Sequence, residues 1–133
     1  TQWFAIKQAH DYPVIGLEND TGELCGFATY GSFRALPAYH YTVEHAVYVH
    51  PNYIGQGLGR RLLERLVEHA ITQDYHVMVG VIDSTNQASI GLHEALDFKC
   101  VGQMPEVGYK FGQWLSVVLY QKILATPLSP QEG

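Results

Sequence analysis

The feature that most constrains the fold is residues 48–63, where an apolar strand leads into a glycine-rich loop and then directly into an amphipathic helix. Glycines stand at alternating positions of the loop, Gly55, Gly57 and Gly59. Glycine lets the backbone approach a ligand closely, and a helix start presents unpaired N–H groups and a partial positive charge. The segment therefore predicts an anion site that suits a phosphate or a pyrophosphate.

Two familiar phosphate motifs do not explain this loop. A P-loop ends in Gly-Lys-Ser/Thr, whereas here Gly59 is followed by Arg60 and Arg61, which excludes a nucleoside triphosphatase of that type. The dinucleotide fingerprint needs an acidic residue after the next strand, and Asp83 stands there. However, the strand before the loop follows an antiparallel meander, not the start of a βαβ pair. A purely structural turn remains open.

The pattern along the chain predicts an α/β sandwich on a mixed sheet. An initial helix is expected to end within 3–10, with Pro13 stopping it. Period-two and β-branched segments predict strands, and amphipathic segments predict helices at 57–74 and 87–96. The expected strands are 14–18, 24–33, 42–49, 76–82, 98–104 and 114–123, with a turn at 19–22 and a connection at 105–112. We expect one domain over 1–125 and a frayed tail over 126–133.

Composition and charge limit the kinds of molecule that the protein is expected to bind. The chain carries 8 Lys+Arg against 13 Asp+Glu, a formal net charge of −5, and no basic run, which excludes nucleic acid as an expected partner. No apolar run approaches the ~20 residues that cross a bilayer. Cys25 and Cys100 form no metal or redox motif, and we interpret them as buried, reduced thiols of a cytoplasmic protein. The seven histidines show no metal-ligand spacing, so no metal is expected.

Several motifs together resemble the GNAT superfamily of N-acetyltransferases. They are Val-Tyr-Val at 47–49, Gly-x-Gly-x-Gly at 55–59, Gly-Arg-Arg-Leu-Leu at 59–63 and Asn-x-x-Ser-x-x-x-His-Glu-x-x-x-Phe at 86–98. The segments 41–45 and 108–114 are similar to the branch that acetylates phosphinothricin, methionine sulfoximine and related amino acids. The resemblance covers about 22–124. It implies a mixed, mostly antiparallel sheet flanked by helices, with the family's N-terminal strand and first helix missing from this sequence.

The resemblance also implies acetyl-CoA as co-substrate, with no metal. Backbone amides of the glycine loop would bind the pyrophosphate, and the strand before it would splay from its neighbour and bind the pantetheine arm and the acetyl carbonyl. The second helix would contact the CoA arm. The implied coenzyme-binding residues are Val47, Tyr48, Val49, Gly55, Gln56, Gly57, Leu58, Gly59, Arg60, Asn86 and Ser89. Where the family usually has Arg or Gln, this chain has Ile54, so recognition there must rest on backbone, with Gln56 as a compensating side chain.

Two residues are candidates for acid–base chemistry. Glu44, in the middle of a strand, is the candidate base that takes a proton from an ammonium substrate; its alternative is an exposed strand carboxylate. His93 replaces the family's usual Tyr as the acid for the departing thiolate; its alternative is a helix histidine that bonds a local carbonyl, and a water could serve as the acid instead. The loop that precedes the Glu44 strand is expected to bind the substrate carboxylate, with the residues Arg34, Pro37, Ala38 and Tyr39. Arg34 could equally be a solvated loop residue.

These observations favour an N-acetyltransferase that moves acetyl from acetyl-CoA to the α-amino group of a small amino acid or glutamate-like analogue by direct attack. The alternative from another class is a CoA-binding regulatory or interaction module with weakened catalysis. A peptide acetyltransferase would require an open groove. The expected partners are a small-molecule amine and a second copy of the chain in a homodimer.

Overall fold

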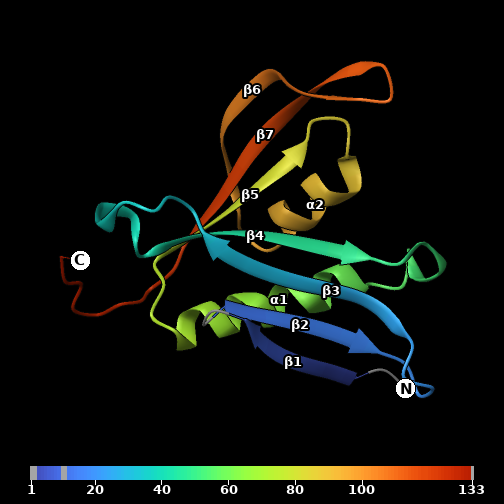
Figure 1. The fold of residues 1–133 in the computed structure, drawn as a ribbon, viewed down its shortest axis with the longest axis horizontal. Coiled ribbons are helices and arrows are strands. Elements are labelled where there is room, and N and C mark those ends of the chain that lie inside the picture. Colours follow the sequence, from blue (N-terminus) through green and yellow to red (C-terminus); the bar gives the residue numbers. More distant parts are fainter. Residues whose placement is uncertain (1–2, 10–11, 133) are drawn as a thin grey trace.

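The protein is built on one mixed sheet, described by a computed structural model for residues 3–9 and 12–132. In that part of the chain seven strands lie in the order β1-β2-β3-β4-β5-β7-β6 (Figure 1). The strands are β1 (Trp3–Ala9), β2 (Tyr12–Glu18), β3 (Leu24–Ser32), β4 (Thr42–Val49), β5 (Val77–Asp83), β6 (Lys99–Lys110) and β7 (Gln113–Ile123). The helices are α1 (Leu58–Thr72) and α2 (Gln87–Ala95), with single 3₁₀ turns at Pro37–Tyr39 and Pro51–Tyr53.

The pairing of β4 with β5 is parallel, and the other pairings in the described sheet are antiparallel. A parallel pair needs a crossover, which α1 provides. The two strands pair only from Thr42–Val77 to His45–Gly80. Beyond that point they fan apart, as Figure 1 shows. This divergence is the feature of the fold that creates room for a site.

The core lies between α1 and the face of the sheet made by β2, β3 and β4. The buried face of α1 consists of Leu58, Leu62, Leu63, Leu66 and Ala70. Period-two alternation in the strands supplies the opposing layer, Ile15, Leu17, Ala28, Tyr30, Val43 and Met78. Among the described residues, no helix has both the length and the apolar character needed to span a membrane.

Most predicted elements are confirmed, but the expected helix at the start is wrong. Residues 3–9 form β1, which pairs antiparallel with β2 from Trp3–Glu18 to Ala9–Tyr12. His10, at the end of the predicted helix, lies outside the described residues. A short apolar segment fits a helical or an extended period, so pairing with a neighbouring strand decides its structure.

The C-terminal third differs from expectation in three places. The predicted connection at 105–112 belongs mostly to β6, which continues to Lys110 because a register shift between Met104 and Gly108 absorbs the extra residues. Cys25 is buried as expected, whereas Cys100 is exposed on β6. The tail is not frayed throughout: Thr126 bonds back to the body of the protein, and Gln131 N–H donates to the hydroxyl of Tyr41 at 3.0 Å.

The α1 face gives a test of this core. Leu62 is fully buried, so Leu62→Ala should lower the free energy of unfolding by about 2–5 kcal/mol, through lost transfer energy and the cavity left behind. Urea denaturation followed by circular dichroism measures the change. Ile71 lies on the same helix with 40% of its surface exposed. Ile71→Ala should therefore cost much less, and equal losses in the two variants would contradict the packing described.

Candidate functional site

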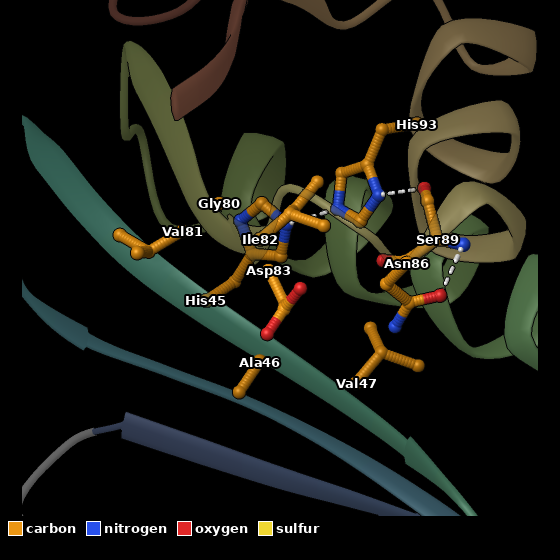
Figure 2. Close-up of a pocket in the computed structure, with 10 residues that line it drawn as sticks. All are labelled: His45, Ala46, Val47, Gly80, Val81, Ile82, Asp83, Asn86, Ser89 and His93. Carbon is orange, nitrogen blue, oxygen red and sulfur yellow. Dashed lines mark hydrogen bonds between the residues drawn. The ribbon is translucent and has the colours of Figure 1, made fainter. Parts of the chain in front are cut away.

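A cavity of about 180 Å³ opens where β4 and β5 diverge. Its walls are the edges of these two strands and the facing side of α2 (Figure 2). The lining residues are His45, Ala46, Val47, Gly80, Val81, Ile82, Asp83, Asn86, Ser89 and His93. Within the described residues, β5 makes no pair with β4 beyond Gly80, so the β4 backbone from Ala46 onward faces this opening unpaired by β5.

A larger groove of about 390 Å³ runs beside the glycine loop. It shares Val47, Asn86 and Ser89 with the cavity. The remaining lining residues are Val49, Tyr53, Ile54, Gly55, Gly57, Leu58, Gly59, Arg60, Ala88 and Leu92. Because the two spaces share a wall, the start of α1 and the opening between β4 and β5 lie on one continuous surface.

The glycine loop needs its glycines for conformation. Gly55 and Gly57 have φ of +90° and +74°, in the region that L side chains rarely adopt. Gly57 is the N-cap of α1, and no side chain caps this helix end. The first turn also carries no acidic residue. The amides at the start of α1 therefore keep their partial positive charge for a ligand.

The loop is anchored through Tyr53 to the turn between β2 and β3, which lies at the same end of the sheet. The amide of Asn19, in the turn between β2 and β3, donates to the Tyr53 hydroxyl at 2.9 Å, and this hydroxyl donates to Glu23. The preceding turn is closed by the Asn52 N–H, which donates to His50 Nδ1 at 3.1 Å. These bonds fix the wall of the groove on the loop side.

The start of α2 is set by two side chains that accept hydrogen bonds from backbone. Asp83 accepts from the Thr85 N–H and hydroxyl, which lowers the pKa of this carboxyl below its ordinary value. Asn86 Oδ1 accepts from the Ser89 N–H at 3.1 Å and so caps the helix. These contacts orient the helix face that carries Ser89 and His93 toward the cavity.

Two histidines meet at the back of the cavity. His45 Nε2 and His93 Nε2 lie 2.9 Å apart, so the rings meet edge to edge, with their planes inclined by 22° (Figure 2). His93 Nδ1 lies 2.7 Å from the Ser89 carbonyl oxygen. Burial lowers the pKa of His45 to about 3, with a further contribution from His93. Burial also lowers the pKa of His93, partly offset by the Ser89 carbonyl.

Glu44 lies on the opposite face of the sheet from the two histidines. Along β4, Val43 and His45 are buried and Glu44 is exposed, as strand alternation requires. Glu44 pairs with Gly31 on one side and Val79 on the other, immediately before the divergence. Glu44 lines neither the cavity nor the groove, and its pair with Val79 precedes the last β4–β5 pair, His45–Gly80.

The structure brings together most of the predicted coenzyme-binding residues but not the predicted substrate loop. Neither Tyr48 nor Gln56 lines the groove or the cavity, and the Tyr48 ring packs beside Phe27. Arg34 and the turn Pro37–Tyr39 also stand outside both spaces, with the Arg34 guanidinium 5.1 Å from the Tyr39 ring centre. Ile54 lines the groove and is 70% exposed, which fits recognition there by backbone.

Sequence reasoning missed His45, whose contact with His93 joins residues 48 positions apart. Its position between two inward-facing valines, Val43 and Val47, was the available signal for an inward-pointing polar side chain. In the part of the chain that the structure describes, no group of three or more His, Cys, Asp or Glu side chains could hold a metal ion.

Comparison with known proteins identifies similar sequences, and all of those named below are acetyltransferases or acyltransferases. Residues 1–98 match the model of the acetyltransferase (GNAT) family. The chain is 44% identical to the L-methionine sulfoximine/L-methionine sulfone acetyltransferase of Salmonella typhimurium, covering 96% of this chain and 74% of that protein. It is 45% identical to the L-amino acid N-acyltransferase MnaT of Escherichia coli, covering 90% and 69%.

Among solved structures, a GNAT superfamily phosphinothricin acetyltransferase from Sinorhizobium meliloti, in complex with acetyl-CoA, superposes with a TM-score of 0.83. The two sequences are 32% identical, and the match covers 92% of this chain and 66% of the other. The diverging strands, the glycine loop at a helix start and the extent of these matches lead to one conclusion: the chain belongs to the GNAT acetyltransferase family.

Proposed function

We propose that the protein is an acetyl-CoA-dependent N-acetyltransferase that acts on the α-amino group of a small amino acid of the methionine sulfoximine or phosphinothricin type. The observation that carries the proposal is the continuous surface from the start of α1 to the opening between β4 and β5. The names of the similar proteins, which are acetyltransferases of such amino acids, support the choice of substrate class.

Acetyl-CoA suits the groove because recognition there rests on backbone. The glycine loop would hold the pyrophosphate, since Gly57, Leu58 and Gly59 line the groove beside Arg60 at the start of α1. The pantetheine arm follows the shared wall of Val47, Asn86 and Ser89 into the cavity. The thioester then reaches the unpaired edge of β4, where backbone N–H groups stabilise the oxyanion that forms on the acetyl oxygen.

The chemistry is a direct attack with a base and an acid on opposite faces of the sheet. Glu44 takes a proton from the substrate ammonium, and the free amine attacks the acetyl carbon. The C–N bond forms, the C–S bond breaks, and the sulfur leaves with the electron pair. Burial keeps His93 neutral at rest, but negative charge developing on the sulfur raises the pKa of this imidazole. The nitrogen loses its second proton as the amide forms, and His93 takes up this proton and gives it to the thiolate once its Nε2–H has turned from His45 to the sulfur.

Recognition of the amino acid itself belongs to the Glu44 face. The loop after β3 is the candidate for the substrate carboxylate, with Arg34 as the cation and Pro37, Ala38 and Tyr39 as its frame. The loop directly follows the strand whose Gly31 pairs with Glu44.

Beyond the site, we propose a cytoplasmic homodimer without nucleic-acid or membrane partners. The acidic net charge of −5 supports the first exclusion. The exposed aromatic residues near the tip of the β6–β7 hairpin, Tyr109, Phe111 and Trp114, support self-association. Sedimentation equilibrium should give twice the chain mass of 14.9 kDa. A monomer at micromolar concentration would contradict the dimer.

A substitution in the glycine loop should specifically weaken coenzyme binding. Gly57→Glu places a carboxylate at the anion site, so isothermal titration calorimetry should show acetyl-CoA affinity reduced at least about tenfold. The matched control is Gly22→Glu in the turn between β2 and β3, because Gly22 has a similarly positive φ of +81° and an added Cβ would likewise meet no atom within 4 Å. The control should bind acetyl-CoA like the wild type. Equal affinities for all three proteins would remove the loop from the site.

Replacing Glu44 should reduce turnover without reducing coenzyme binding. Release of CoA thiol is followed with a panel of amino acids that includes methionine sulfoximine and phosphinothricin. Glu44→Gln should lower kcat by about 10²–10⁴-fold, the usual contribution of a positioned base, with an unchanged KM for acetyl-CoA. Glu18→Gln makes the same change at the end of β2 and should keep wild-type turnover.

Two results would change this assignment. Wild-type kcat in Glu44→Gln would exclude this residue as the base. Binding of acetyl-CoA by the wild type without thiol release from any amino acid would indicate the CoA-binding module instead of the enzyme.

A further inference from the structure

The contact between His45 and His93 is tightly enclosed. Phe98 closes one side, with its ring centre 5.3 Å from that of His45 and 5.1 Å from that of His93. On the other side a Cβ at Gly80 would meet Nε2 of both rings at 3.0 and 3.1 Å. The exposed fraction is 6% for His45 and 4% for His93. The two imidazoles therefore have one shared arrangement, and water does not separate them.

The hydrogen positions in this pair follow from the acceptors. The Ser89 carbonyl can only accept, so His93 Nδ1 carries a hydrogen (Figure 2). When His93 is neutral, its Nε2 therefore carries no hydrogen and can only accept. The hydrogen in the 2.9 Å contact then belongs to His45 Nε2. His45 Nδ1 must be bare, and it is a buried atom with no hydrogen-bond partner among the described residues.

A proton bound by His93 reverses this contact. Protonated His93 carries hydrogens on both nitrogens, so its Nε2–H must donate and His45 Nε2 must accept. The proton balance is met when the added proton occupies the bare Nδ1 of His45 and the shared hydrogen passes to His93. One proton enters, the bond between the rings persists with its direction reversed, and the positive charge lies on His93, where the Ser89 carbonyl also faces it.

We propose that His45 is a positioning residue for His93: by changing tautomer it pairs with both the neutral and the protonated ring, and so allows a buried imidazole to serve as the acid. The inference deepens the proposed function, on which the role of His93 rests. A hydrogen bond from a charged donor is about twice as strong as a neutral one, so the acceptor at His45 stabilises protonated His93 more than neutral His93. Loss of that acceptor should lower the pKa of His93.

Other titratable groups near His93 keep one charge state around neutral pH. Tyr120 approaches from β7 with its ring centre 6.4 Å from that of His93, and burial raises its pKa. Its hydroxyl donates to Glu94 at 3.1 Å. Asp83 lines the same cavity from β5, and the bonds from Thr85 lower its pKa. A pH-dependent change between pH 5 and 9 at His93 therefore reports the histidine pair.

The test compares three variants of the full chain with the wild type. His45→Leu removes every hydrogen-bonding atom and keeps an apolar side chain. His45→Gln keeps a donor and an acceptor on one amide, which can turn to face either form of His93. His45→Phe is a second apolar variant in case the leucine variant does not fold, as judged by circular dichroism.

The first readout needs no substrate. An NMR titration of ¹⁵N-histidine-labelled protein, with the His93 signal assigned by its loss in His93→Gln, gives the His93 pKa in each form. The apolar variants should lower it by roughly one pH unit, the difference expected between a charged and a neutral hydrogen bond. The glutamine variant should stay near the wild-type value. An unchanged or raised pKa in the apolar variants would overturn the proposal.

The second readout is turnover. In the apolar variants kcat at pH 7 should fall about tenfold, and the alkaline decline of kcat should move to lower pH by about one unit, with the KM for acetyl-CoA unchanged. His45→Gln should recover most of the rate. Equal losses in Gln and Leu variants, with no movement of the pH profile, would mean that His45 only fills space. If the wild type transfers no acetyl group, the proposed function fails, and the NMR titration still decides the histidine pair.

Discussion

The site depends on the separation of β4 from β5 after the His45–Gly80 pair. A parallel pair needs a crossover, and this crossover is α1, whose first turn is the proposed anion site. Continued pairing would satisfy the strand edges with each other and leave neither a cavity nor backbone groups for a ligand. The divergence therefore supplies both ends of the site at once, because the segment that joins the two strands also carries the glycine loop.

The charge distribution shows how an acidic chain can accommodate a polyanion. The net charge is −5, yet the first turn of α1 has no acidic residue and contains Arg60 and Arg61. Arg60 is paired at 3.4 Å with Glu64, so its charge is partly neutralised. Peptide dipoles at the helix start do not depend on such pairing. Attraction in the groove is thus local and short-ranged, and the overall acidity of the surface opposes it only weakly at physiological salt.

Local patterns predicted much of this fold, and long-range contacts decided the rest. The glycine loop, α1 and the β4 strand follow from the pattern of neighbouring residues. Residues 3–9 have an ambiguous period, and their pairing with β2 is not written in their own sequence. The extension of β6 to Lys110 depends on a register shift opposite β7. Within the candidate site, the glycine loop at the start of α1 was predictable from the sequence. The His45–His93 contact was not, because it depends on which strand lies beneath α2.

The placement of Glu44 and His93 on opposite faces of one sheet also bears on the order of events in the proposed reaction. In that reaction the coenzyme would approach along the groove of α1 and α2, and the amine would approach from the Glu44 face. Each has a separate entrance, so neither blocks the other's arrival or departure. Both must nevertheless be present together, since the acetyl carbon is transferred through the gap between the strands. Such geometry suits a ternary complex with random addition and argues against a ping-pong cycle.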